Sequence, residues 1–449
     1  MRDAHPVTIT DGSFRYHRPW WRDPVLWIVV VAFVVRLGVI LAHHTYLFAS
    51  IFPGIQHLNG AYGFETGSIA AAIARGEGFS SPFYRPTGPT TWIAPVYPYM
   101  CAVFFKLLGG FTHRAAVAVL CLNSLFSALT SAVIYKIAAR ISGPKLGLWS
   151  ALVWAVGFWF WPTFALWDTS TSALLVALAV LFALHLEDES PLKKWIGFGA
   201  FWGVALLTNP ALLTVFALSL AWLYYRAGRR QMTNRKPIAV SVLACMVVIS
   251  PWMIRNRIVF GQFVFIRGNF FYEFYLGNHA PLQGFNPVSL HPAGNKVEFA
   301  KYKSMGELAY VASKRREALN FVFQHPKDFL TLTAKRMIWF WDNTSTMYLA
   351  RLNTPPRDLL LFMYFSILSF VGLGTALARR MPAAGFFTLL TFLYPWPYYI
   401  TYTQNRYRHA VEPLMVIVSV YFVFEVAAAV RLKIGGKTPA GELKPSLMR

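Results

Sequence analysis

Two acids and a scattered set of arginines are the residues of this chain whose types and positions could carry chemistry. Glu65 follows an apolar run, Pro24 to Leu47, and begins a segment rich in small residues. Asp168 stands just before a second apolar run, 169–186. A carboxylate held at the edge of an apolar run can serve as a general base toward a hydroxyl group. Glu65 and Asp168 are therefore the candidate catalytic residues.

Each acid also has a purely structural interpretation. Glu65 stands where the first turn of a helix would favour a negative charge through the helix dipole. Asp168 precedes Thr169 and Ser170 as an N-cap residue would. A structural role and a catalytic role remain open for both residues at this point.

Cationic side chains that could bind a phosphate form the second group. Arginine suits this task because its planar guanidinium matches two phosphate oxygens at once. The candidates are Arg85, Arg255, His279, Arg406 and Arg408. An isolated arginine at a membrane interface often only extends toward lipid headgroups. Arg406 and Arg408 are better candidates, because they lie in an expected outer loop where positive charge works against the usual orientation rule.

Aromatic residues near Glu65 could stack on a sugar. Tyr62, Tyr84 and Trp92 are the candidates, and their alternative is membership of the aromatic belt at a membrane interface. The basic run 314–316 is interpreted as a solvated helix face, and Arg36 as a packing residue within a span, since a charge in the membrane requires a partner.

The composition places these residues in a polytopic membrane protein. The 449 residues are 56% hydrophobic and only 14% charged. The net charge of +23 does not indicate a nucleic-acid partner, because the basic residues fall mostly in short segments between apolar runs. Cys101, Cys121 and Cys245 all lie in apolar segments, so they are expected to be core residues and not disulfides or metal ligands.

About ten transmembrane helices are expected in an all-α fold. The apolar runs are 24–47, 115–138, 146–163, 169–186, 195–209, 210–226, 238–254, 358–378, 383–402 and 410–430. Positive charge concentrates before the first run, in alternate loops and after the last run, which places both termini in the cytoplasm. The expected location is the inner membrane of a bacterium, with the active site on the external face.

Two long segments are then external. The first, 48–114, contains the apolar stretch 92–109, which is short and carries Pro95 and Pro98, so we expect an interfacial helix there and not a span. The second, 255–357, is polar and is expected to contain helices at 306–324 and 327–341. The predicted organisation is a transmembrane catalytic module over 1–254, an external region over 255–357 and C-terminal helices with a cytoplasmic tail over 358–449.

Several short motifs together resemble the class C glycosyltransferases. They are, in chain order, the acid at the start of the first loop, GEGFSSPF at 76–83, PVYP at 95–98, WDT at 167–169, LTNP at 207–210, SPWMIRN at 250–256, LGN at 276–278 and RYR at 406–408. The similarity covers most of the chain. Its nearest group is the bacterial glycosyltransferase family 39 type, related to protein O-mannosyltransferases and lipid A aminoarabinose transferases.

The resemblance implies sugar transfer from a polyprenyl-phosphate carrier to a protein, lipid or glycan acceptor at the outer face, in contact with membrane lipids. It also implies a substrate-binding role for Asn278. The chain departs from the family in two places. The family often has an Asp-Glu pair in the first loop where this chain has Phe64-Glu65, and Glu where this chain has Asp168. The missing carboxylate weakens the case for a divalent metal, and no cofactor is expected.

The chemistry fits one displacement with inversion. A phosphate is a good leaving group, so the enzyme needs a base for the acceptor hydroxyl and cations for the departing phosphate. Retention through two flanking carboxylates is the less suitable alternative. Two other function classes remain open, a flippase of lipid-linked sugar and a polymerase or ligase of surface polysaccharide. A flippase needs a polar path across the membrane, and the expected spans carry little charge besides Arg36.

Overall fold

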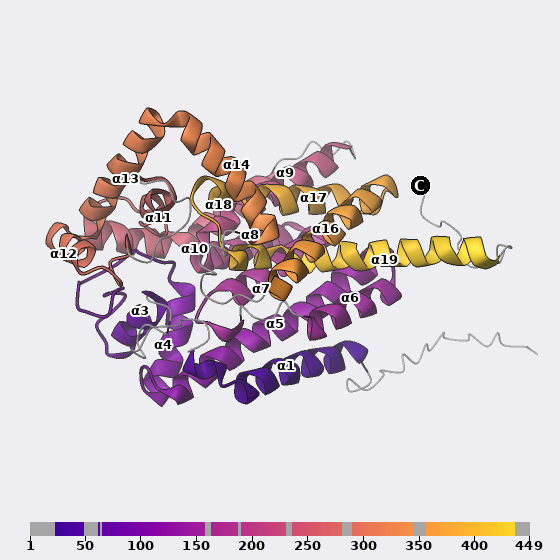
Figure 1. Cartoon of the computed structure of the whole chain (residues 1–449), viewed down its shortest axis with the longest axis horizontal. Coiled ribbons are helices and arrows are strands. Elements are labelled where there is room, and N and C mark those ends of the chain that lie inside the picture. The colour runs from indigo at the N-terminus through magenta and orange to yellow at the C-terminus, as the bar shows by residue number, and fades with distance from the viewer. Residues whose placement is uncertain are drawn as a thin grey trace, which may run out of the picture.

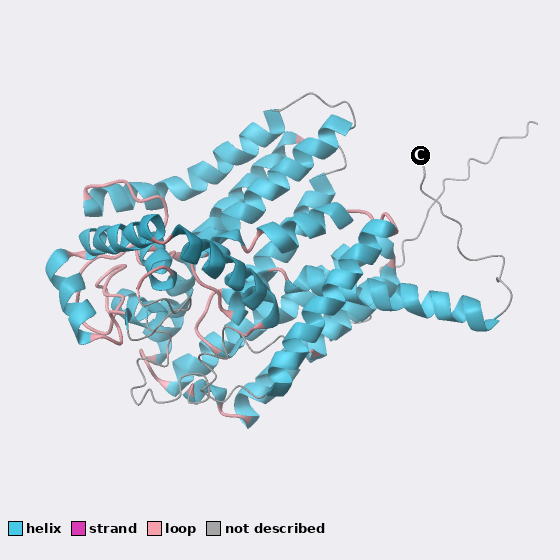
Figure 2. Cartoon of the chain, turned by 45° about the horizontal axis from the view of Figure 1, so that its top comes forward, coloured by secondary structure: helices cyan, strands magenta, loops and turns pink. Residues whose placement is uncertain are grey.

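The computed structural model describes residues 23–48, 62, 65–157, 163–186, 190–229, 236–280, 290–344 and 356–435. Within these ranges the chain is helical, and the sole extended pairing is an isolated bridge between Ser80 and Pro89 (Figure 2). The all-α membrane fold predicted from the sequence is confirmed.

Seven helical segments in the described ranges are long and apolar enough to cross a bilayer. They belong to α1 (Pro24–Ala42), α5 (His113–Ser142), α7 (Thr169–Leu186), η4 with α9 (Pro210–Leu212 and Leu213–Arg229), α10 (Lys236–Phe260), α16 (Pro356–Ala378) and α19 (Glu412–Gly435). Each corresponds to one of the expected spans.

The other three expected spans also contain helices, but these are shorter than the roughly 20 residues that a bilayer requires. They are α6 (Pro144–Val156), α8 (Leu192–Thr208) and α17 (Ala384–Leu393), the last followed by α18 (Trp396–Ile400). α8 packs closely on α10 because it carries glycine at the contact: a Cβ on Gly199 would lie 2.1 Å from the Ser241 carbonyl oxygen. Within the described ranges, helices of unequal length therefore occupy all ten places at which spans were expected.

Arg36 is fully buried where α1, α5 and α6 meet. Its guanidinium donates to Ser127 Oγ at 3.0 Å and to the carbonyl oxygens of Ala155 at 2.9 Å and Trp154 at 3.1 Å. Arg36 therefore packs three helices together, as expected for an intramembrane charge that has found polar partners.

Both expected external segments lie at one end of the molecule (Figure 1, left). This end contains the helices α3 (Glu65–Ala74), α4 (Val96–Leu108), α11 (Phe270–Gly277), α12 (Lys296–Met305) and α13 (Glu307–Gln324), with α14 (Pro326–Asp342) leading back to the bundle. The start of α1 and the end of α19 lie at the opposite end. α4 has 13 residues and packs beside α3 and α5.

The structure corrects two details of the sequence-based predictions. α10 continues to Phe260, so Arg255 lies in its last turns and not beyond the helix. Lys314 is 3% exposed and pairs with Glu298 at 3.1 Å, so the predicted solvated face holds for Arg315 and Arg316 but not for Lys314.

Candidate active site

Glu65 is the first residue of α3, and its carboxylate lies against two side chains from distant parts of the chain. Nε2 of His291 lies 3.0 Å from Oε1, and the indole Nε1 of Trp92 donates to the same oxygen at 3.4 Å. The Glu65 side chain keeps 25% of its accessible surface. One oxygen is therefore held by the protein, while the side chain remains open to a substrate.

The surroundings of Glu65 favour its ionised form. Burial by itself would raise the pKa of this carboxyl, but the hydrogen bond from His291 and, more weakly, the positive charge of Arg406 hold the pKa below its ordinary value. Glu65 is therefore ionised at neutral pH and can accept a proton directly.

Two of the three predicted sugar-stacking aromatics lie beside Glu65. Trp92 is fully buried, and its ring packs edge-on against Phe83 with 4.9 Å between centroids. Tyr84 is 36% exposed, and partial burial together with the negative charge of Glu65 raises the pKa of its hydroxyl. Tyr84 is thus exposed near Glu65, whereas Trp92 is buried and contacts Glu65 through its indole N–H.

A buried acid of the external region holds the segment that leads into Trp92. Glu307, the first residue of α13, is 6% exposed. Its Oε1 accepts hydrogen bonds from the backbone N–H of Thr91 at 2.7 Å and from its hydroxyl at 2.6 Å, and Oε2 accepts from Tyr302 at 2.8 Å. A Cβ on Gly268 would lie 2.6 Å from Oγ1 of Thr91, so glycine is required for this close approach.

Asp168 lies directly before α7, and Ser172 Oγ donates to its Oδ2 at 3.4 Å. Burial raises the pKa of Asp168, and the positive charges of Arg406 and Arg267 offset this effect only in part. Asp168 and Glu65 therefore differ in their tendency to hold a proton, and Glu65 is the stronger candidate for a base at neutral pH.

Arg406 brings the two acids into one site. It lies on η6 (Asn405–Ala410), which packs against α7. Its guanidinium stacks over the Trp167 ring at 4.3 Å, and Nε donates to Gln404 at 2.7 Å. Burial would lower the pKa of Arg406, but Tyr407, Tyr402 and, to a smaller extent, the acids Asp168 and Glu65 raise it. The cation is thus stabilised by both candidate catalytic acids.

A second arginine of this site was not predicted from the sequence. Arg267 pairs with Glu273 at 3.1 Å, and its Nε donates to Asn269 at 2.6 Å. Burial raises the pKa of Asp168 and of Tyr407, and the charge of Arg267 opposes both rises in part. No local pattern points to Arg267, because it is recruited by the packing of the external region onto the C-terminal helices. His291 was missed as well, because it meets Glu65 only through the packing of the external region onto the first loop.

Comparison with known proteins places these residues in context. Residues 91–254 match the sequence family described as dolichyl-phosphate-mannose-protein mannosyltransferase. No curated protein matches the chain. The matched segment contains Trp92 and Asp168 but ends before His291 and Arg406.

Solved structures match over nearly the whole chain. The oligosaccharyltransferase of Archaeoglobus fulgidus in its apo form is 14% identical, with 94% of this chain and 54% of that chain covered and a TM-score of 0.53. The same archaeal protein tethered to an acceptor peptide containing the NVT sequon is 15% identical, with 94% of this chain and 52% of that chain covered and a TM-score of 0.52. ArnT from Cupriavidus metallidurans bound to undecaprenyl phosphate is 14% identical, with 94% of this chain and 81% of that chain covered and a TM-score of 0.38.

The resemblance to the class C glycosyltransferases is confirmed. The chain spans about half the length of the archaeal protein and shares the fold of that half. Glu65 and Arg406 both lie outside the matched residues 91–254.

Arg408 is placed differently from Arg406. Its side chain is fully buried and pairs with Glu412 at 2.9 Å, and Nη1 donates to Ser366 Oγ at 2.6 Å and to the Phe362 carbonyl at 3.1 Å. Glu412 also binds Nδ1 of His409 at 2.6 Å. The structure does not bring Arg408 to the acids, because its charge is neutralised inside the bundle.

Other predicted ligands also serve the protein itself. Arg255 donates to the carbonyl oxygens of Thr90 and Phe79, both at 2.9 Å, and so fixes the first loop to α10. Asn278 is fully buried; it donates to the Ile400 carbonyl at 2.8 Å and accepts from Arg336 at 3.1 Å.

Tyr62, Arg85 and His279 complete the predicted set. Tyr62 is buried among aromatic rings, and its hydroxyl donates to the Thr112 carbonyl. Arg85 is exposed, with its guanidinium 5.7 Å from the Phe299 ring centroid. Nδ1 of His279 donates to the Tyr275 carbonyl at 3.0 Å. Tyr62 and His279 are thus engaged by backbone carbonyl groups, whereas the exposed guanidinium of Arg85 is available to a ligand.

The described residues do not offer a metal site. No group of three or more His, Cys, Asp or Glu side chains that could hold a metal ion occurs among them. One structure of the archaeal oligosaccharyltransferase is a complex with Zn and sulfate. In this chain Glu65 meets one histidine and one tryptophan, so its donor set does not fit a metal.

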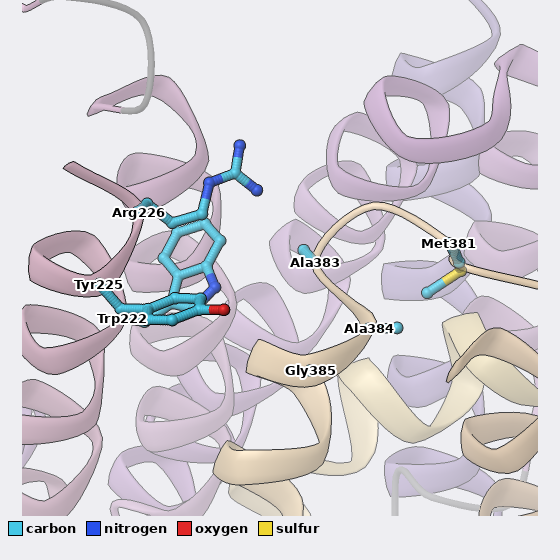
Figure 3. Close-up of a pocket in the computed structure, with 7 residues that line it drawn as sticks. All are labelled: Trp222, Tyr225, Arg226, Met381, Ala383, Ala384 and Gly385. Carbon is cyan, nitrogen blue, oxygen red and sulfur yellow. The ribbon is translucent and has the colours of Figure 1, made fainter. Parts of the chain in front are cut away.

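A separate cavity of about 380 Å³ lies between α9 and the start of α17 (Figure 3). Its lining residues include Trp222, Arg226 and Met381, and the Trp222 ring stacks on Phe386 at 4.4 Å. None of the candidate site residues lines this cavity, so it lies apart from the two acids and Arg406.

Proposed function

We propose that this protein is an inverting glycosyltransferase that moves a sugar from a polyprenyl-phosphate carrier to an acceptor hydroxyl. The observation that carries the proposal is that Glu65, an ionised base with one carboxylate oxygen held by the protein, lies within the electrostatic reach of Arg406, a cation whose pKa both acids raise. A base and a cation in one site are the two groups that this transfer requires.

The step is a single displacement. The acceptor oxygen attacks the anomeric carbon as Glu65 takes the hydroxyl proton. The new bond from acceptor oxygen to anomeric carbon forms while the bond from that carbon to the phosphate oxygen breaks. The electron pair leaves with the phosphate, which departs as polyprenyl phosphate carrying one more negative charge. One displacement inverts the anomeric configuration, and no covalent sugar–enzyme intermediate is needed.

Arg406 and Arg267 are suited to receive the negative charge of the leaving phosphate. Each guanidinium is fixed by protein acceptors on its Nε and Nη2, with Gln404 and Tyr407 on Arg406, and Asn269 and Glu273 on Arg267. Among the described residues, neither Nη1 has a hydrogen-bond acceptor. Charge-assisted bonds from these atoms would stabilise the phosphate. Asp168, beside both arginines, would orient the acceptor or assist Glu65.

The matched family gives the first substrates to test. Its description names dolichyl-phosphate mannose as donor and protein as acceptor, so a polyprenyl-phosphate hexose and a serine- or threonine-containing peptide are tested before pentose donors and lipid or glycan acceptors. The charge distribution supports placing the site at the external face of a bacterial plasma membrane, because the basic loops belong to the opposite, cytoplasmic side.

The test uses the purified full chain in detergent. The protein is incubated with a serine- or threonine-containing peptide and, in turn, short-chain polyprenyl-phosphate mannose, glucose, galactose or arabinose, and glycosylated peptide and released polyprenyl phosphate are both measured by mass spectrometry. We expect release from one donor, and loss of that release in Glu65→Gln. Glu77→Gln is the matched control, since Glu77 is an exposed acid of the same loop that pairs with Arg75 at 2.6 Å. Release unaffected by Glu65→Gln would overturn the proposal, as would a protein that moves lipid-linked sugar across vesicles and releases nothing.

A further inference from the structure

We propose, on the basis of the proposed function, that His291 is a positioning residue for Glu65 that acts as a neutral, permanently oriented hydrogen-bond donor. The proposal assigns a role in the reaction to the turn before α12, a part of the external region in which the sequence shows no catalytic motif.

The hydrogen bonds of the His291 ring define which nitrogen carries the proton. The backbone N–H of Ala293 donates to Nδ1 at 3.1 Å. A backbone N–H can only donate, so Nδ1 must be the unprotonated nitrogen. In a neutral imidazole the proton is then on Nε2, which faces Oε1 of Glu65 at 3.0 Å. His291 therefore donates to Glu65 and cannot take a second proton without losing its bond from Ala293.

The backbone of His291 is fixed as firmly as its ring. The His291 carbonyl accepts from the N–H groups of Gly294 and Asn295, both at 2.8 Å. Asn295 in turn caps α12 by accepting from Val297 at 2.8 Å and Glu298 at 3.1 Å. A side chain on a capped turn has little freedom to swing away from its partner.

Aromatic rings enclose the imidazole on its other sides. Phe83 lies edge-on at 5.3 Å between centroids, Tyr272 at 5.9 Å and Trp92 at 6.3 Å, and His291 is only 8% exposed. Trp92 donates to the oxygen of Glu65 that His291 also contacts. The two donors thus share Oε1, and since no other described side chain hydrogen-bonds to Glu65, Oε2 can meet the acceptor hydroxyl.

The charged and titratable groups that face this pair come from several elements. Arg406 on η6 acts on Glu65 from the side of the C-terminal helices. The negative charge of Glu65, added to the effect of burial, raises the pKa of Tyr84 in the first loop and of Tyr272 in α11. These groups stay in place when His291 is replaced, so a change in the ionisation of Glu65 can be assigned to His291.

Two substitutions of His291 test the roles of its two ring nitrogens separately. His291→Gln places an amide N–H₂ near the position of Nε2 and can still donate to Glu65. His291→Asn places its amide near Nδ1 and retains a partner for Ala293, but loses the donor to Glu65. We expect His291→Asn to lower kcat by about ten- to a hundred-fold with little change in donor KM. The acid limb of kcat against pH is compared in an Asp168→Asn background, where Glu65 sets it, and there it should move to higher pH because the group that lowers the pKa of Glu65 is gone. His291→Gln should keep most of the activity.

His325→Asn is the matched control, because this exposed histidine lies at the start of α14, where its side chain is 50% exposed. All variants are compared by thermal unfolding in detergent, and Glu65→Gln is assayed beside them. Equal losses in His291→Asn and His291→Gln without a shift of the acid limb would overturn the proposal, since they would show a packing role only. Full activity in His291→Asn with an inactive Glu65→Gln would overturn it while leaving the proposed function intact. An active Glu65→Gln would instead overturn the proposed function.

Discussion

The backbone N–H and the hydroxyl of Thr91 both donate to one carboxylate oxygen of Glu307, 216 residues further along the chain. This contact joins the first loop to the external region directly beside Trp92, whose indole N–H reaches Glu65. The first loop, which carries part of the site, is therefore held in place by α13. Several helices of the membrane bundle lie between these two segments in the sequence.

Removing this acid should loosen the site. Glu307→Ala leaves the buried N–H of Thr91 without an acceptor, which costs about 1–3 kcal/mol. We expect a lower unfolding temperature in detergent and a lower kcat, because Trp92 would no longer be fixed. The control is Asp328→Ala, because Asp328 is an exposed acid near the start of α14. This substitution should change neither the unfolding temperature nor kcat. Unchanged stability in Glu307→Ala would show that the two external segments do not depend on this contact.

Arg406 and Arg408 should behave differently although they are two residues apart. Arg406→Ala is expected to raise the donor KM by about ten- to a hundred-fold, and Arg406→Lys should restore only part of the loss, since the charge remains but the planar fork does not. Donor saturation curves measure both effects. An unchanged donor KM in Arg406→Ala would place this residue outside donor binding.

Arg408→Ala should act on stability. It leaves Glu412 buried without its arginine, and breaking a buried pair in this way costs about 3–5 kcal/mol. We expect poor yield or a strongly lowered unfolding temperature, with a donor KM near that of the wild type in whatever protein folds. A stable Arg408→Ala protein with weakened donor binding would contradict this prediction and show that Arg408 binds the donor.

The two acids should be separable by pH. The pKa of Asp168 is raised and that of Glu65 is lowered, so Asp168 takes up a proton first as the pH falls. If ionised Asp168 assists the reaction, the wild-type acid limb reports Asp168, and Asp168→Asn should both reduce kcat/KM and move the remaining acid limb to lower pH. A limb that stays in place in Asp168→Asn would assign it to Glu65 or another group.

The expected sidedness can be tested with single cysteines after replacement of Cys101, Cys121 and Cys245. Glu77→Cys and Arg114→Cys, both exposed, flank α4 and should be labelled from outside by an impermeant reagent. Lys193→Cys at the start of α8 should be labelled only after permeabilisation. Labelling of one flank of α4 without the other would show that α4 crosses the membrane.

Much of this fold follows from patterns that are local in the sequence. The apolar runs predicted the positions of ten helices, and Glu65, Asp168 and Arg406 were identified because each stands at the edge of such a run. His291 and Arg267 could not be identified in this way. Their roles depend on the packing of a region 226 residues from Glu65 onto the first loop, for which no periodicity exists.

The difference between Arg406 and Arg408 was also beyond the sequence. Both lie on the same short 3₁₀ helix, where residues two apart point in different directions. Arg406 stacks on Trp167, from where its charge acts on both acids, and Arg408 pairs with Glu412 inside the bundle. Only the way in which η6 rests on α7 and α19 decides which arginine meets a ligand.

The site draws its side chains from positions 65, 168, 267, 291 and 406, which bears on how the protein is made. A nascent chain that has reached α16 already contains both acids, His291 and Arg267, but not η6. Without Arg406 it lacks one of the two cations proposed to receive the leaving phosphate. Under the proposed function, the site is complete only once η6 has been made, so a prematurely ended translation product would be unable to turn over a lipid-linked donor.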